Sequence, residues 1–484
     1  MQRDLARLQA EEHDVLVVGG GIHGAAAAWD AAQRGLRVAL VEAADFGGGA
    51  SWNSLKTIHG GLRHLQRADL AGLRESVRER RALLAIAPEL VRPLPFLLPL
   101  RGHGTRGRAA LTVALRAFDL LSRDRNRGLP PSHYIPKGRI VGRAELGTLV
   151  PGLDAAGHGG GALWHDAQVA SSDRLLMGFL HAAAKAGAVL ANFAEVVGLL
   201  RAGGSVSGAR VRDAETGQAF DVRARLVVGA AGAAAAAVAA HAGIALESPP
   251  WLEAMNLVLT RPAVREVAVG GEADGRLLFL VPWNGRAMVG TEYGGAAQAR
   301  DAPAWAAAFL ARARQAFPWA ELRDEDVALV HRGRVPGRSA HALMTRHRVI
   351  DHQAAHGVAG LVSIVSAKFT TARAAAEDAI DLALRHLGRA PVPCRTAVTA
   401  LPSARPLAGD LAAQARAAVR DEMALHLADA VMRRLDLGTA GPPDHAALDA
   451  VAAALGAELG WSTQRLAEER TALLRSLAPP FPPA

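Results

Sequence analysis

The hydrophobic pattern of the first 42 residues predicts a compact alternation of strands and a helix. Residues 14–18 form a short apolar run, residues 25–32 are rich in Ala, and residues 38–41 form a second apolar run. Short apolar runs are typical of buried strands, and the small residues between them favour a helix packed closely on a sheet. We therefore predict a strand, a tight turn, a helix and a second strand.

The turn between the first strand and the helix reads GGGIHG, which places glycines in a G-x-G-x-x-G pattern at Gly19, Gly21 and Gly24. Such glycines allow a tight turn, close approach of a pyrophosphate, and close packing of helix on strand. Glu42 ends the second strand, where a carboxylate accepts hydrogen bonds from an adenosine ribose. The pattern predicts a dinucleotide site for FAD or NAD, and the acid argues against the 2′-phosphate of NADP.

Three later segments extend this pattern. Residues 51–61 are small and polar and predict a loop across the cofactor, whereas residues 70–84 have apolar positions at helical spacing with charged residues between them, which we interpret as a solvated face. Residues 226–246 predict a buried strand followed by a helix rather than a membrane span. In the loop and just after it, hydroxyls, amides and cations suited to phosphates and a ring edge come from Ser51, Ser54, Lys56, His59, Gly60, Gly61 and Arg63.

Composition bounds the class of protein. The 484 residues are 50% hydrophobic and 21% charged, which predicts a globular chain of two or three domains. One cysteine, Cys394, excludes a disulfide framework and a thiolate metal cluster and fits a reducing compartment. The histidines 331, 341, 347, 352 and 356 lack H-E-x-x-H or paired Cys/His spacing, so we predict no metal site.

The net charge of +9 does not predict a nucleic-acid partner, because the basic residues are spread along the chain without an aromatic-rich RNA signature or zinc-finger spacing. Attraction to anionic lipid headgroups stays open. Residues 1–14 are charged and lead directly into the first strand, so we expect no secretory signal. We expect a soluble cytoplasmic protein, with peripheral attachment to the inner face of the membrane as the alternative.

Three long motifs resemble the FAD-dependent glycerol-3-phosphate dehydrogenases: GGGIHG, DFGGGASWNSLKTIHGGLRHLQ at 45–66, and SAKFTTARAAAEDA at 366–379. The resemblance covers nearly the whole chain and implies FAD as the dinucleotide. It implies an α/β fold with a discontinuous Rossmann-like FAD-binding domain, an antiparallel substrate-binding sheet and a small C-terminal helical domain. We assign the FAD-binding domain to 1–95, 155–250 and 340–400, the substrate-binding domain to 96–154 and 251–339, and the helical domain to 401–484.

The resemblance also implies roles for individual residues. Gly232 would lie beside the flavin pyrophosphate, and the backbone amide and carbonyl of Ala194 would read adenine. Arg63 and Arg346 would bind the substrate anion, since Arg makes bidentate hydrogen bonds to phosphate. Lys368 would favour the anionic reduced flavin, and Phe369 and Thr370 would contact the cofactor. We also expect Thr370 and Thr371 to cap the following helix.

The chain departs from the family pattern in its substrate pocket. Val335 in GRVPG stands where the family usually has Arg, and Asn256 stands where it usually has His. Arg334 could replace the lost cation only if a bulge changes which face of the strand it occupies. His64 stands where Tyr is usual, and His64 or His331 is a candidate base because imidazole titrates near neutral pH.

These observations predict FAD-dependent oxidation of glycerol 3-phosphate to dihydroxyacetone phosphate, with hydride transfer from C2 to flavin N5. One alternative is oxidation of another small anionic 2-hydroxy acid or amine, and a second is a non-catalytic flavin-binding protein. The electron acceptor is left open between quinone and oxygen. The oligomeric state is open too, with a dimer as one candidate.

Overall fold

The structure is a computed structural model that describes residues 1–102, 104–153, 157–247, 249–402 and 407–481. Its first sheet has eight strands, and the apolar run of β1 (Glu12–Val18) lies at its centre. β1 pairs in parallel with β10 (Ala219–Gly229) on one side and with β2 (Val38–Val41) on the other. The remaining strands are β7 (Val189–Ala191), β8 (Ala194–Ala202), β9 (Ser205–Asp213), β17 (Arg348–Asp351) and β18 (Leu361–Val365).

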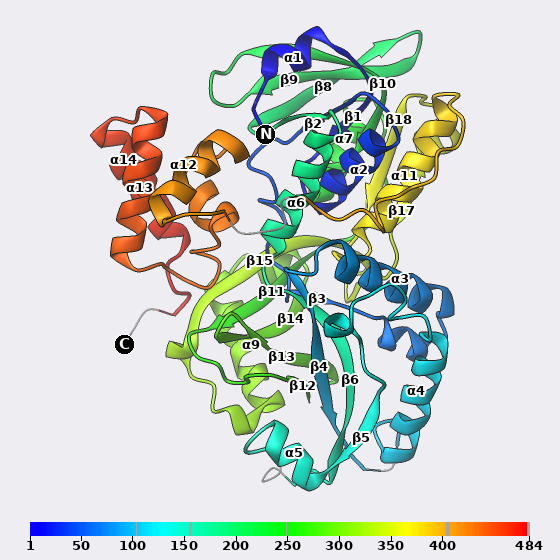
Figure 1. The fold of residues 1–484 in the computed structure, drawn as a ribbon, viewed down its shortest axis with the longest axis vertical. Coiled ribbons are helices and arrows are strands. Elements are labelled where there is room, and N and C mark those ends of the chain that lie inside the picture. The colour runs from blue at the N-terminus through cyan, green and yellow to red at the C-terminus, as the bar shows by residue number, and fades with distance from the viewer. Residues whose placement is uncertain (103, 154–156, 248, 403–406, 482–484) are drawn as a thin grey trace.

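Helices cover one face of this sheet, in the upper part of Figure 1. α2 (Ile22–Gln33) packs between α6 (Ser172–Lys185) and α11 (Ala372–His386). The alanines 25–28 of α2 are almost completely buried, because small side chains allow the helix to approach its neighbours closely. Side chains of the short helices α1 (Leu5–Ala10) and α7 (Ala235–Ala240) pack into a separate apolar cluster. The predicted Rossmann-like, parallel core is confirmed.

The second sheet has ten strands and forms the lower half of the molecule in Figure 1. Its described pairs are antiparallel except for the parallel pair β4–β12. The helices that flank this sheet are α3 (Leu70–Ile86), α4 (Arg108–Leu121), α5 (Arg143–Leu149), α8 (Ala296–Ala299) and α9 (Ala302–Ala316). The strands are β3 (Thr57–Ile58), β4 (Val91–Pro99), β5 (Arg139–Gly142), β6 (Gly160–Val169), β11 (Trp251–Leu259), β12 (Ala268–Ala273), β13 (Arg276–Trp283), β14 (Arg286–Gly294), β15 (Val327–Ser339) and β16 (Ala342–Leu343).

The two sheets divide the chain differently from our assigned ranges at four strands. β3 and residues 91–95 of β4 lie in the second sheet, although they fall within the range 1–95 that we gave to the FAD-binding domain. β6 lies in the second sheet, although it falls within the range 155–250 that we gave to the FAD-binding domain. β16 also lies in the second sheet, although it falls within 340–400. The boundary that we set at 155 lies outside the described residues. The exact domain limits therefore stay a prediction.

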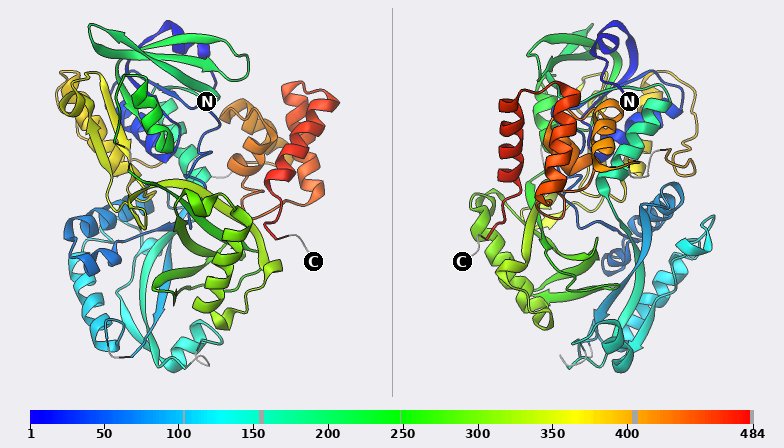
Figure 2. Two further views of the ribbon diagram at one scale, coloured as in Figure 1. Left: turned by 180° about the vertical axis from the view of Figure 1, so that it is seen from behind. Right: turned by 60° about the vertical axis from the view of Figure 1, so that its left-hand side comes forward.

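The C-terminal region is helical, with α12 (Leu411–Glu422), α13 (His445–Leu459), α14 (Thr463–Ser476) and a π-helical segment at Asp429–Arg434. Figure 2 shows from two further directions that these helices lie beside the first domain. Within the described residues, no helix combines the length and the apolar character that crossing a bilayer requires. The predicted small helical domain is confirmed.

The charged residues of α3 are not simply a solvated face, as we expected. Glu79 and Arg80 are buried. Glu79 forms an ion pair with Arg373 of α11, and Arg80 forms one with Asp166 of β6. Periodicity could not distinguish these two positions from their exposed neighbours, because their partners lie 86 or more residues away in sequence.

Candidate active site

The glycine turn after β1 has the geometry of a phosphate-binding turn. Gly19 has φ +109°, and a Cβ there would lie 2.6 Å from the carbonyl oxygen of Ala230. A Cβ on Gly24 would lie 1.8 Å from the carbonyl oxygen of Gly19. Both positions therefore require glycine, and Gly21 forms the N-cap of α2, whose positive end favours an anion.

Glu42 is held at the end of β2 by two backbone hydrogen bonds. Gly20 N–H donates to Oε2 at 2.6 Å, and Ala44 N–H donates to Oε1 at 3.0 Å. Burial raises the pKa of Glu42, although these hydrogen bonds favour its ionised form. The side chain lines the cavity described below, which suits it to accept hydrogen bonds from a ribose.

A cavity of about 1200 Å³ connects this turn with the second sheet. Its size exceeds that of an ordinary small-ligand pocket and suits an extended dinucleotide with a small substrate. The sequence-predicted residues that line it are Gly19, Gly21, Glu42, Ser51, Ser54, His59, Gly61, Arg63, His64, Ala194, Gly232, Arg334, Lys368, Phe369 and Thr370. The structure thus brings together residues from every segment that the motifs singled out.

Polar groups at the far end of the cavity form a chain. His64 lies in a 3₁₀ helix (Leu62–Arg67), and its Nδ1 is 2.8 Å from Oδ2 of Asp69. Its Nε2 is 2.8 Å from Nζ of Lys368. Oδ1 of Asp69 accepts a hydrogen bond from Arg346 at 2.8 Å. Arg63, by contrast, faces the cavity and forms no hydrogen bond or ion pair with any described residue.

The family of the chain follows from its match to known proteins. Residues 14–382 match the family described as FAD dependent oxidoreductase, and residues 396–466 match the C-terminal domain of alpha-glycerophosphate oxidase. The chain belongs to the FAD-dependent oxidoreductase family. Its cofactor is FAD, as the glycine turn and Glu42 predict, and it is an enzyme rather than a non-catalytic flavin-binding protein.

Relatives and solved structures agree with this membership. The chain is 30% identical over 440 residues to a glycerol-3-phosphate dehydrogenase of Synechocystis sp., covering 83% of this chain and 75% of that protein. It is 33% identical to glycerol-3-phosphate dehydrogenase 2 of Mycobacterium tuberculosis, covering 79% of this chain but only 64% of that protein. The fold is similar to glycerol-3-phosphate dehydrogenase from Bacillus halodurans complexed with FAD (TM-score 0.74, 21% identity, 100% and 99% coverage). The predicted resemblance to the glycerol-3-phosphate dehydrogenases is confirmed.

Five predicted site residues of the oxidoreductase do not line the cavity: Gly24, Lys56, Gly60, His331 and Arg346. Gly24 and Gly60 act through packing and the backbone, since Gly60 N–H donates to Oδ1 of Asp166 at 2.5 Å. Arg346 is half exposed and pairs with Asp69.

Lys56 points inward, away from the position we predicted beside the cofactor. Its Nζ donates to the carbonyl oxygen of Trp52 at 2.7 Å and to Oγ of Ser172 at 2.8 Å. It also lies 5.2 Å from the centre of the Trp283 ring. Burial lowers the pKa of Lys56. Through these contacts the residue ties the loop at 51–61 to α6.

Two backbone expectations also need correction. The N–H of Ala194 donates to the carbonyl oxygen of Glu42 at 2.7 Å, so this amide is not available to adenine. Thr371 is the N-cap of α11 but makes no capping hydrogen bond, and the hydroxyl of Thr370 instead accepts from His59 N–H at 3.2 Å. Ala194 and Thr370 line the cavity, but local pairing decides which of their atoms are free.

The altered substrate strand keeps a regular register. β15 pairs with β11 without a shift from Pro336–Trp251 to Leu329–Val258, so the bulge that could have moved Arg334 is absent there. Val335 and Arg334 both line the cavity, but Arg334 lies 3.8 Å from Glu253 and its side chain is 57% exposed.

His331, the other candidate base, and Asn256, which stands where the family usually has His, both differ from His64 in their contacts. Asn256 is buried, donates from Nδ2 to the carbonyl oxygen of Asn53 at 2.9 Å, and accepts from Thr291 at 2.9 Å. His331 is buried, and its Nε2 is 2.7 Å from the carbonyl oxygen of Thr439. Burial and the charge of Lys56 lower the pKa of His331 to about 3.

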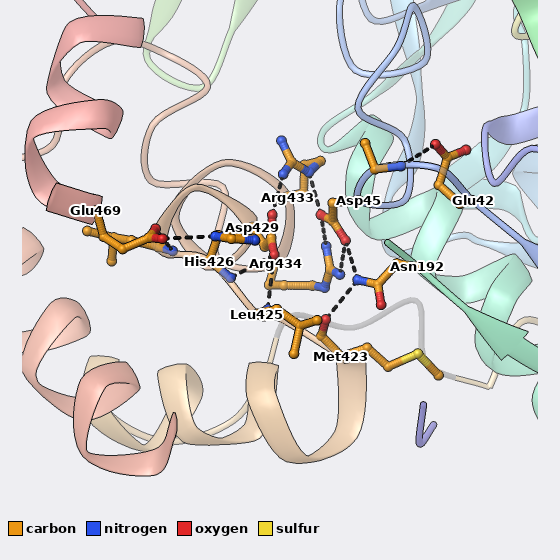
Figure 3. Close-up of polar contacts among 12 residues, drawn as sticks. Glu42, Asp45, Asn192, Met423, Leu425, His426, Asp429, Arg433, Arg434 and Glu469 are labelled. Carbon is orange, nitrogen blue, oxygen red and sulfur yellow. Dashed lines mark hydrogen bonds and ion pairs between the residues drawn. The ribbon is translucent and has the colours of Figure 1, made fainter. Parts of the chain in front are cut away.

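Sequence reasoning missed a charged cluster that lies near Glu42, shown in Figure 3. Asp45, three residues after Glu42, accepts hydrogen bonds from Arg434 at 2.7 and 2.8 Å and from Arg433 at 2.5 Å. Nδ2 of Asn192 donates to the same carboxylate at 3.0 Å. The C-terminal domain therefore holds the loop that follows Glu42.

His23 and Asp69 were missed as well. His23 follows the glycine turn, lines the cavity, and has a buried Nε2 without a hydrogen-bond partner among the described residues. Burial lowers the pKa of His23 to about 4. The only sequence feature that could have identified His23 was its place inside the motif GGGIHG. For Asp69 it was the short separation from His64 along the chain.

Proposed function

We propose that the oxidoreductase converts glycerol 3-phosphate to dihydroxyacetone phosphate. The observation that carries the substrate class is Arg63, a cation that faces the cavity and has no hydrogen bond or ion pair among the described residues. A guanidinium can bind a phosphate through two parallel hydrogen bonds. The names of the relatives from Synechocystis sp. and Mycobacterium tuberculosis support this substrate.

The protein's own part in the reaction is orientation, charge and proton transfer. Arg63 would hold the phosphate, with Arg332 and Arg334 at the edge of the same cavity. Gly19, Gly21 and Glu42 would hold FAD, which supplies the two-electron oxidant when bound. Lys368 would place positive charge where negative charge develops during the reaction.

A second candidate substrate is another small anionic 2-hydroxy acid or amine. It is favoured by Val335, which lines the cavity where the related dehydrogenases usually carry Arg. The loss of that cation weakens the case for a dianionic phosphate more than the case for a carboxylate, since a dianion gains more from each added cation.

The test is anaerobic mixing of the FAD-loaded protein with each candidate while flavin absorbance is followed. We expect glycerol 3-phosphate to bleach the flavin at lower concentration than lactate, glycolate or glycine. Bleaching by one of these acids, with no response to glycerol 3-phosphate, would refute the proposed substrate and leave the family and cofactor unchanged.

We propose quinone or oxygen as the electron acceptor, and a cytoplasmic location with peripheral attachment to the membrane. The positive net charge of +9 supports attraction to anionic lipid. Reoxidation of substrate-reduced protein by a soluble quinone or by oxygen separates the two acceptors. Sedimentation with vesicles containing 30% anionic lipid tests the attachment, and a dimer is tested by light scattering.

A further inference from the structure

The imidazole of His64 is held at both ring nitrogens by charged neighbours. The carboxylate of Asp69 lies 2.8 Å from Nδ1, and the amine of Lys368 lies 2.8 Å from Nε2. His64 is buried, with 8% of its side chain exposed, yet both His64 and Lys368 line the cavity. The ring therefore connects a carboxylate outside the cavity with an amine inside it.

This arrangement selects one tautomer of His64. A carboxylate can only accept a hydrogen bond when ionised, so Nδ1 must carry the proton that is shared with Asp69. Nε2 is then unprotonated and accepts a hydrogen bond from the ammonium of Lys368. The opposite tautomer would place two acceptors, Nδ1 and Oδ2, against one another.

Asp69 is itself fixed by neighbours on other elements. Its Oδ1 accepts from Gly72 N–H in the first turn of α3 at 3.0 Å and from Arg346 at 2.8 Å. Burial opposes ionisation of Asp69, but these hydrogen bonds and the one to His64 outweigh it and lower its pKa to about 2. The carboxylate is therefore ionised across the whole range in which imidazole titrates.

The charged groups around His64 and Lys368 allow these two side chains together to take up one more proton. Burial lowers the pKa of His64 most, the charges of Lys368 and Arg346 lower it further, and Asp69 raises it. Burial also lowers the pKa of Lys368, while Glu75 and Asp69 raise it and Arg346 and Arg67 lower it. His64 is thus neutral at pH 7 in the free protein, with Asp69 ready to stabilise the imidazolium.

We propose that Asp69 is a positioning residue that fixes His64 as the Nδ1–H tautomer, so that the His64–Lys368 pair accepts the hydroxyl proton of the substrate. The ammonium of Lys368 first passes a proton to Nε2 of His64. The neutral amine, which faces the cavity, then takes the proton as the substrate O–H bond breaks. The pair gains one proton, and the C–H hydrogen with its two electrons goes to the oxidised flavin.

This inference rests on the proposed oxidation of an alcohol, and it accounts for the loss of the usual His at position 256. Asn256 has both amide groups engaged and has no basic nitrogen. Nε2 of His331 is occupied by the carbonyl of Thr439, and His331 does not line the cavity. A base on the other wall of the same cavity would take over the proton transfer.

The test compares Asp69→Asn with Asp69→Ser in the FAD-loaded protein. Asn keeps an oxygen for Gly72 N–H and Arg346, but its amide would donate to Nδ1 of His64 and force the proton onto Nε2. Ser keeps the capping oxygen, which Ser provides well at an N-cap, and is too short to choose a tautomer. Both variants therefore preserve the helix start, and the melting temperature of each checks folding.

The first readout needs no substrate. With ¹⁵N-labelled histidine, and with His64→Gln to identify the signals, we expect Nδ1 to be protonated in the wild type and Nε2 in Asp69→Asn. Protonated Nε2 in the wild type, or an unchanged tautomer in Asp69→Asn, would overturn the proposal. This result is independent of which substrate the enzyme uses.

The second readout is anaerobic flavin reduction by glycerol 3-phosphate as a function of pH. Because general-base catalysis contributes on the order of 10²- to 10⁴-fold, we expect Asp69→Asn to slow reduction by about that factor with little change in half-saturating concentration. Asp69→Ser should lose less. Equal rates in wild type and Asp69→Asn, at equal folding, would also overturn the proposal, whereas failure of the wild type to be reduced refutes the substrate instead.

Discussion

A cluster of charged residues and a single arginine border the cofactor cavity, and they differ in whether their charges are paired. At the junction with the C-terminal domain, Asp45 is buried and its two oxygens accept from Arg433, Arg434 and Asn192. At the substrate end, Arg63 has no hydrogen bond or ion pair within the described residues.

The difference separates a structural contact, whose charges are satisfied within the protein, from a charged group that is available to a ligand. A buried charge is tolerated only when its partners satisfy it, so the first cluster is a closed structural contact. A cation without a partner costs stability but keeps its hydrogen bonds for a ligand. The enzyme therefore pairs the charges on the side of its cavity beside Glu42 and leaves Arg63, which we propose binds the substrate, without a partner among the described residues.

The largest expected effect is on the closed cluster. Asp45→Ala leaves Arg434 buried without its main carboxylate, and breaking a buried pair in this way costs about 3–5 kcal/mol. We expect a matching fall in the free energy of unfolding measured with urea, together with weaker retention of FAD on dilution. Arg420→Ala, which breaks an exposed pair with Glu458, is the control and should change little.

The substrate end should respond in affinity rather than in stability. Arg63→Ala should weaken binding of glycerol 3-phosphate by about 2–5 kcal/mol, or roughly 30- to several-thousandfold, since it removes a charge-assisted contact. The half-saturating concentration for flavin reduction measures this, and the urea midpoint should hardly change. A loss of stability as large as that of Asp45→Ala would contradict the distinction between the paired cluster and Arg63.

Acid should weaken the junction at which Glu422 of the C-terminal domain pairs with Arg174 of α6. Burial opposes ionisation of Glu422, but the hydrogen bond from His181 and the charge of Arg174 lower its pKa from 4.5 to about 2. A depressed pKa contributes stability that is present above pH 4.5 and lost as pH falls towards 2, here about 3 kcal/mol. Unfolding free energies at several pH values should show this slope, and Glu422→Gln should flatten it.

The smallest effect is expected at the altered strand. Arg334 is more than half exposed and lies 3.8 Å from Glu253, so Arg334→Ala should weaken substrate binding by less than about 1 kcal/mol. Arg332→Ala should cost more, because its Nε is buried in the cavity wall without a partner among the described residues. If both variants bind the substrate as tightly as the wild type does, neither arginine replaces the cation missing at Val335.

Sequence patterns identified the residues whose partners lie close to them in the chain. Gly19 and Gly24 could be identified because the turn and its helix lie within a few residues, and Glu42 because a ribose acid closes the same βαβ unit. Lys56 was placed on the correct loop but turned inward, because its partner Ser172 is 116 residues away. A loop sequence does not encode which way a long side chain points.

Long-range pairing explains the other failures. Asp45 and Arg434 are 389 residues apart, and nothing near either residue marks the contact. Asp69 is close to His64 in sequence, but the left-handed backbone of Ala68 between them (φ +51°) is what brings the carboxylate onto the ring. Arg346 was expected to bind substrate, and whether it does so beside its pair with Asp69 stays a prediction.

Strand β15 touches three parts of the molecule within five residues. His331 contacts Thr439 of the C-terminal domain, a Cβ on Gly333 would lie 2.9 Å from Ala50 of the cofactor loop, and Val335 lines the cavity. These three residues share one face of the strand, so inserting or deleting a single residue would turn all of them away together. Exchanging one side chain along β15 leaves this register unchanged, whereas a change in the strand's length would disturb all three contacts together.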